Sequence, residues 1–166
     1  MRTAIEPIQV GRGPVRRHDA RVRQFSRDHL LLERLDTLVV DDDQARAIVV
    51  SSCVLLGVNA PRLKFHGRRS MYTGATERPR SAWVDLLGED EVERRELLGW
   101  GAMPRSGAIR LGRRTTLMTI AHELGHYIVF CVDPSGTPAH GKQWVARFDD
   151  AAAAVVAVVD ASALSA

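Results

Sequence analysis

The sequence contains only two cysteines, Cys53 and Cys131, and no C-x-x-C pair. A zinc ribbon is built from such pairs, so this kind of structural metal site is excluded. A disulfide scaffold is also excluded, because it needs several bridges in a short chain. Both cysteines fall in apolar segments that are expected to be helical. They are therefore predicted to be buried free thiols in a reducing compartment.

Long apolar runs are missing as well. Residues 1–22 are rich in Arg and Gly and have no apolar stretch typical of a secretory signal. The longest apolar run near the other end, residues 151–159, stops at Asp160 and is too short to span a bilayer. We therefore expect a cytoplasmic protein that does not engage a membrane.

Aromatic residues make up only 5% of the chain, but apolar residues in total make up 45%, which is enough for a packed core. A chain of 166 residues is expected to form one domain. Residues 1–14 end in a cluster of Gly and Pro and are predicted to be a flexible segment before a single domain at 15–166. Residues 76–106 are polar and acidic and are interpreted as an insertion or a lid.

Neither sign of charge dominates, and the net charge is only +3. The basic residues nevertheless form two clusters in the sequence. These are Arg12, Arg16, Arg17, Arg21, Arg23 and Arg27, and then Arg62, Lys64, Arg68, Arg69, Arg78 and Arg80. Such clusters can follow a phosphate backbone, but the modest net charge favours an ordinary solvated surface. Nucleic acid is therefore a partner that the sequence allows but does not favour.

The most informative stretch is residues 119–128, T-I-A-H-E-L-G-H-Y-I, which contains the pattern H-E-x-x-H in an apolar run without proline. On a helix, His122 and His126 are about one turn apart, so both imidazoles leave the same face and can bind one ion. Glu123 points to the flank of that face, where its carboxylate can accept a proton from a water molecule. The pattern is typical of zinc hydrolases, so the expected cofactor is Zn2+.

A catalytic zinc usually has three protein ligands. His140 is the predicted third, because the Pro- and Gly-containing loop at 133–138 can bring it back to the helix. The competing carboxylates are less suitable. Asp133 is too close along the chain to fold back, and Asp149 and Asp150 would lie two turns into the next helix.

These residues predict a division of roles. His122, His126 and His140 bind the metal, and Glu123 acts as general base and later passes its proton to the leaving amine. The oxyanion needs a further stabiliser. The candidates, among which the sequence does not choose, are Tyr72, Tyr127 and His66.

Local signals predict the elements before this stretch. An apolar stripe indicates a helix over 16–35. Asp41 and Gln44 have capping-box spacing before a helix over 45–56, and Gly57 is its C-cap. Alternation indicates a strand over 62–66, with 71–74 as its hairpin partner. Residues 83–87 are predicted to be a short strand or turn, and 89–98 an acidic surface helix ended by Gly99.

The later elements are predicted in the same way. Residues 107–111 alternate as a strand, and Thr115 or Thr116 is expected to cap the metal-binding helix, which runs to Cys131. A last helix follows His140, with Trp144 on its apolar face. The predicted class is α+β, with helices packed on one side of a small, mostly antiparallel sheet and the metal-binding helix lying across it.

Residues 108–148 comprise a strand, T-L-M-T-I-A-H-E-L-G-H, a Pro/Gly loop and A-H-G-K-Q-W. This order resembles the SprT-like group of zincin metallopeptidases, in particular the small metallohydrolases of actinobacteria and their phages. In that group the His-Gly after the loop carries the third ligand, which corresponds to His140 and Gly141 here. The resemblance implies a zincin-like fold and a zinc-dependent metallopeptidase that hydrolyses peptide bonds in a protein or peptide substrate.

Two alternatives remain. H-E-L-G-H-Y-I is also common in ImmA/IrrE-type regulatory peptidases, but the Glu-x-x-Ala-Asn-type helix that follows there is missing. SprT-like proteins themselves often carry a cysteine zinc ribbon for DNA binding, and this sequence has none.

The second alternative is a basic nucleic-acid-binding module with a non-catalytic zinc, whose fourth ligand would be His66 or Cys131. Cys131 lies on the apolar face of the helix, and an idle site has no use for Glu123.

Overall fold

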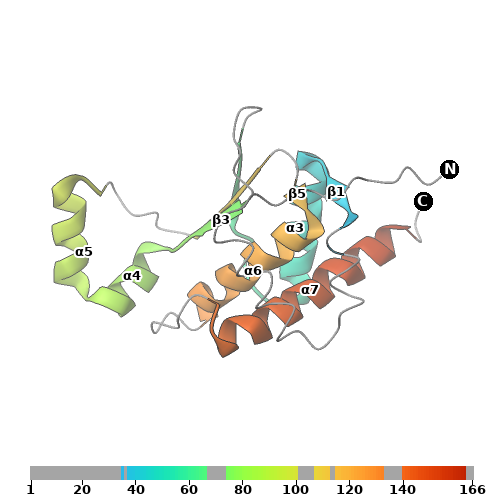
Figure 1. Ribbon diagram of the computed structural model, residues 1–166. Helices are drawn as coiled ribbons and strands as arrows, with labels where there is room; N and C mark the ends of the chain where they lie inside the picture. The colour runs from blue at the N-terminus through green and yellow to red at the C-terminus, as the bar shows by residue number, and fades with distance from the viewer. Residues whose placement is uncertain are drawn as a thin grey trace.

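The structure is a computed structural model that describes residues 35, 37–66, 74–100, 107–112, 115–132 and 140–163. The segment 1–14, and all but the last residue of the helix predicted at 16–35, lie outside this part. The elements follow in this order (Figure 1): β1 (Val39–Val40), α3 (Asp42–Leu55), β2 (Arg62–Phe65), β3 (Gly74–Glu77), α4 (Arg80–Leu87), α5 (Glu89–Arg95), a short turn η1 (Glu96–Trp100), β4 (Ala108–Leu111), β5 (Thr115–Thr116), α6 (Leu117–Val132) and α7 (Lys142–Ala163).

The strands confirm an α+β protein with small sheets. β4 is the central strand of a three-stranded sheet in the order β2-β4-β3, pairing in parallel with β2 and antiparallel with β3. β1 and β5 form a separate antiparallel pair. β4 suits the central position because Ala108, Ile109 and Leu111 are fully buried, whereas β2 carries Arg62 and Lys64, which need a solvated edge.

This topology corrects two predictions. The three-stranded sheet is mixed rather than mostly antiparallel, and β2 and β3 are not hairpin partners because β4 lies between them. The strand expected at 71–74 is described only from Gly74, and it runs on to Glu77, while 71–73 lie outside the described residues. A hairpin partner cannot be recognised from alternation alone, since the partner strand is chosen by long-range burial.

The start of α3 agrees with its sequence signals. The Asp41 side chain accepts a hydrogen bond from Gln44 N at 2.8 Å, and the Gln44 side chain accepts one from Asp41 N at 3.0 Å. This is the predicted capping box, which satisfies two backbone donors at the helix start. At the other end Gly57 has φ +67°, a left-handed conformation that glycine adopts without strain.

The core lies where α6 packs along α7, and α3 packs mainly against α7 (Figure 1). The predicted apolar stripe of α6 is buried, including Leu117, Ile120 and Leu124, and Trp144 and Phe148 of α7 are buried against it. A Cβ atom at Gly125 would lie 3.1 Å from Phe148 Cα, so this glycine lets the two helices approach closely. None of the helices in the described part is long and apolar enough to cross a bilayer.

Helices α4 and α5 lie at one end of the molecule, away from α3 and α7 (Figure 1). α4 replaces the strand or turn predicted at 83–87. Five residues with mixed apolar content do not distinguish the periodicity of a helix from that of a strand. Pro79 occupies the N-cap with φ −67° and directs the chain into a helix. The acidic helix predicted at 89–98 is present as α5 and η1, and the chain bends at Gly99, where φ is +89°.

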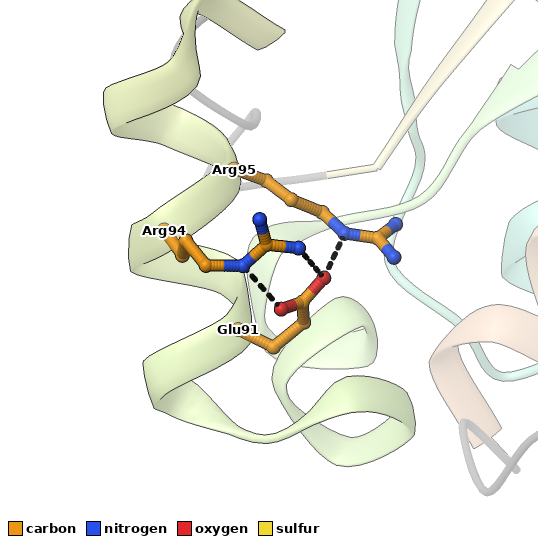
Figure 2. Close-up of polar contacts among 3 residues, drawn as sticks. All are labelled: Glu91, Arg94 and Arg95. Atoms are coloured by element: carbon orange, nitrogen blue, oxygen red, sulfur yellow. Dashed lines mark hydrogen bonds and ion pairs between the residues drawn. The ribbon is translucent and has the colours of Figure 1, made fainter.

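Ion pairs hold α4 and α5 together. Arg80 pairs with Glu89 and Glu96 across the two helices. On α5, Glu91 accepts hydrogen bonds from Arg94 and Arg95 (Figure 2), and these lower the pKa of Glu91 to about 2. That this segment acts as a lid stays a prediction, although residues 76 and 77 of the predicted insertion belong to the sheet.

Candidate metal centre

Three histidine side chains, two from helix α6 and one from the turn before α7, converge beside α7. His122 and His126 lie one turn apart on α6, and His140 comes from the turn that precedes α7. The Nε2 atom of His140 is 2.9 Å from Nε2 of His126 and 3.3 Å from Nε2 of His122. One ligand atom from each ring lies within 4.8 Å of the others. The structure therefore brings together the three predicted ligands as a group that could hold a metal ion.

This donor set fits zinc. Zn–N bonds of about 2.0–2.1 Å in a tetrahedral site place neighbouring nitrogens about 3.3 Å apart, which is close to the two measured Nε2 separations of 2.9 and 3.3 Å. The hydrogen-bonding capacity of imidazole also favours a metal ion at this point. A neutral imidazole has one N–H and one lone pair, so His140 Nε2 cannot make good hydrogen bonds to both partners at once. A cation at the point of convergence would satisfy all three nitrogens.

His140 has an unusual backbone. Its φ is +65°, and it is the only non-glycine residue in the described part with a positive φ. This left-handed conformation is strained for a residue with a Cβ atom, and such strain persists when the surrounding structure imposes it. The next residue, Gly141, accepts a hydrogen bond from Val145 N and so begins α7. The strained turn therefore directs His140 toward α6 at the point where α7 starts.

Trp144 forms the wall behind the histidines. Its ring centroid is 4.9 Å from that of His122, 5.1 Å from that of His126 and 4.6 Å from that of His140. Trp144 is almost completely buried, and its indole Nε1 has no hydrogen-bond partner among the described residues. The indole thus excludes water from one side of the cluster and holds the three rings in place by packing.

Glu123 is buried beside the cluster and is held by strand β3. The Thr76 hydroxyl lies 2.7 Å from Glu123 Oε2 and 2.9 Å from the Glu123 backbone oxygen. A Cβ atom at Gly74 would lie 2.9 Å from Glu123 Oε1, so this strand passes close to the carboxylate only because residue 74 is glycine. Burial raises the pKa of Glu123 to about 7, and the Thr76 hydrogen bond lowers it in part. A carboxylate with such a pKa can exchange a proton near neutral pH.

The other predicted participants do not join this group. The Tyr127 hydroxyl donates a hydrogen bond to Asn59 O at 2.9 Å, which leaves it no proton for an oxyanion. His66 follows β2 and is not part of the histidine cluster, and Tyr72 lies outside the described residues. Asp150, a rejected ligand, pairs with Arg147 on α7. The Tyr127 hydroxyl is therefore engaged elsewhere, and an oxyanion-stabilising role of His66 stays a prediction.

Two of the four described cations of the second basic cluster, Lys64 and Arg80, are paired with carboxylates. Lys64 and Arg110 both pair with Glu77 across the sheet, and Arg80 pairs within the α4–α5 segment. Burial alone would raise the pKa of Glu77, but its hydrogen bonds to Lys64 and Arg110 outweigh that effect and lower it. The interpretation of the cluster as an ordinary solvated surface stays a prediction. Arg78 differs from these cations because its guanidinium lies over the rings of Phe130 and Trp83.

Three neighbours of the site were missed in the sequence. Thr76 and Gly74 lie 47 and 49 positions before Glu123, and a threonine and a glycine carry no local signal for such a contact. Trp144 was predicted only as a core residue. Its spacing of four from His140 was a usable signal, because residues four apart near a helix start lie on one face.

Comparison of the chain with known protein families, curated proteins and solved structures finds no match. The functional argument therefore rests on the arrangement of the chain's own residues.

Proposed function

We infer that the protein is a zinc-dependent metallopeptidase that hydrolyses peptide bonds. The observation that carries this inference is the convergence of three histidine nitrogens, two of them on the helix in which the buried Glu123 directly follows His122. Two histidines on one helix and a third from a following turn are the ligand number of a catalytic zinc site, which keeps one position for water or substrate. The described part contributes no fourth side chain to the cluster, which favours a catalytic over a closed structural site.

The roles follow from the geometry. His122, His126 and His140 would hold the zinc, which when bound lowers the pKa of water and polarises a carbonyl group. Glu123 accepts the proton of the attacking water and donates it to the leaving amine. Thr76 keeps the Glu123 carboxylate in one orientation through its hydroxyl. Trp144 keeps bulk water away from the far side of the ligands, which strengthens electrostatic interactions in the site.

An extended peptide is the substrate that best fits the surroundings. In the described part β3 pairs only with β4, so its other edge offers unpaired backbone groups next to Glu123. A peptide strand can add to such an edge through main-chain hydrogen bonds. A strand beside the H-E-x-x-H helix is also compatible with the zincin-like fold and with the SprT-like resemblance. The ImmA/IrrE-type alternative would use the same zinc and the same base.

Cleavage of a peptide library by the zinc-loaded protein tests this proposal. Products would be identified by mass spectrometry for the wild type and for Glu123→Gln, which keeps the size of the side chain but cannot accept the proton. The variant should retain zinc and lose roughly a hundredfold or more in rate. Asp150→Asn is a control outside the cluster, because Asp150 pairs with Arg147 on α7, and it should cleave like the wild type. Equal cleavage by Glu123→Gln, or no cleavage by the zinc-loaded wild type, would overturn the proposal.

A further inference from the structure

Arg78 lies between the end of β3 and the start of α4, and its guanidinium rests on two aromatic rings. Arg78 Cζ is 4.3 Å from the ring centroid of Phe130 on α6 and 5.2 Å from that of Trp83 on α4. Phe130 in turn stacks on His126, with ring centroids 5.8 Å apart. One aromatic ring therefore separates this cation from a predicted zinc ligand.

Among the described residues this cation has no counter-ion. Arg78 has neither a hydrogen bond nor an ion pair from its side chain to any residue in the described ranges, in contrast to Lys64, Arg80 and Arg110. Its side chain is partly buried, and this desolvation lowers the pKa of Arg78, although an arginine stays charged. The N–H groups of a guanidinium point outward in its own plane, so stacking of the guanidinium on aromatic rings leaves them available as donors. The residue is thus a partly desolvated cation with donors available.

The position of Arg78 follows from strand geometry. Side chains two apart on a strand share a face, so Gly74, Thr76 and Arg78 are directed toward the same side. Gly74 and Thr76 contact Glu123, and Arg78 contacts Phe130, which lies two turns further along α6. β3 and α6 therefore run alongside each other in the same direction. Arg78 directly follows β3, the strand to which a peptide is proposed to add, about 7 Å beyond Thr76.

We propose that Arg78 binds a carboxylate of the substrate about two residues from the bond that is cleaved. A guanidinium recognises a carboxylate through two parallel N–H···O bonds, and a partly desolvated one gains more from this pairing than an exposed one. The proposed substrate is therefore an acidic peptide. Its carboxylate belongs to an Asp or Glu side chain, or it is the C-terminal carboxylate. This inference rests on the proposed peptidase function for the substrate, but the anion site itself can be tested without hydrolysis.

The binding test uses three small probes and zinc-loaded protein. N-acetylglutamate α-amide carries only a side-chain carboxylate, N-acetylglutamine carries only a terminal carboxylate, and N-acetylglutamine α-amide carries none. NMR would follow the Arg78 Nε–H and the Trp83 indole N–H during each titration. We expect a saturable shift with one or both acids, none with the neutral probe, and loss of the shift in Arg78→Met, which retains much of the apolar packing. Arg94→Met, on exposed α5, removes the same charge and should behave like the wild type.

The cleavage test uses peptides matched as Glu against Gln and as C-terminal acid against amide. In the wild type the acidic member should have a kcat/KM roughly tenfold higher or more, and Arg78→Met should remove this difference. Absence of any Arg78-dependent shift with either acid overturns the inference even if peptides are cleaved. A shift that depends on Arg78 without cleavage of any peptide supports the anion site and overturns only the peptidase proposal.

Discussion

The hydroxyl of Thr76 lies 2.7 Å from Oε2 of Glu123, although the two residues are 47 positions apart. This contact joins strand β3 to the helix that carries the histidines. It is close because Gly74, on the same strand, has no side chain to push Glu123 away. The proposed general base is therefore positioned by a strand outside the stretch that contains the metal-binding motif.

Replacement of Thr76 tests this positioning. Thr76→Val keeps the shape and removes the hydroxyl, so kcat should fall roughly ten- to a hundredfold, because a hydrogen bond to a charged group is lost. The bond lowers the pKa of Glu123, so its loss should also move the acid limb of the pH–rate profile to higher pH. Thr76→Ser restores the hydroxyl and should restore both quantities. Unchanged kcat and an unchanged profile in Thr76→Val, at equal zinc content, would refute the role.

Gly74→Ala should damage the same contact by steric means. The added Cβ atom would lie 2.8 Å from Thr119 Cγ2 and 2.9 Å from Glu123 Oε1, so the carboxylate must move. We expect a loss of about 1–3 kcal/mol in the free energy of unfolding and a marked loss of kcat. Gly57→Ala is the control, because Gly57 has φ +67° and open space around it. That variant should lose about 1 kcal/mol through backbone strain and keep full activity.

The strain at His140 predicts a difference between two variants. His140→Ala keeps a Cβ atom at φ +65°, whereas His140→Gly removes it. In metal-free protein, chemical denaturation should show His140→Gly to be the more stable by up to about 1 kcal/mol. In both variants the zinc affinity should fall by more than the roughly 10–100-fold decrease that is typical when a contact outside the ligand shell is lost. A clearly more stable His140→Ala would contradict the strained conformation.

The raised pKa of Glu123 predicts a pH dependence of stability in metal-free protein. Burial holds the folded-state pKa at about 7, above the unfolded value of 4.5. Below 4.5 both states are protonated, and the carboxyl group has no net effect. Between pH 4.5 and 7 the carboxyl group ionises in the unfolded state while it stays protonated in the folded state, so stability falls over this range and levels off above 7. The melting temperature of Glu123→Gln minus that of the wild type should therefore increase between pH 4.5 and 8, and a constant difference would contradict the burial of this carboxylate.

Signals that act within one or two helical turns predicted the structure well. The capping box at Asp41, the buried stripe of α6 and the start of α7 after His140 all depend on neighbours in sequence, so the residues themselves specify them. The histidine cluster was predicted for the same reason. Two ligands are fixed by helical spacing, and the third needed only one loop to return.

Features that depend on distant contacts were not predicted. The parallel pairing of β2 with β4 is decided by which strand is buried on both faces, and alternation in β2 alone does not reveal it. The helix at Trp83 was mistaken for a strand or turn because a short apolar run fits both periods. Thr76 was assigned to an insertion because its partner, Glu123, is far away in sequence.

The zinc content of the purified protein tests the central claim most directly. Wild type, His140→Ala and His66→Ala would be dialysed against metal-depleted buffer, reconstituted with zinc and analysed by inductively coupled plasma mass spectrometry. The three-histidine site predicts about one zinc per chain in the wild type and in His66→Ala, and little or none in His140→Ala. A full complement of zinc in His140→Ala, or no zinc in the wild type after reconstitution, would contradict it.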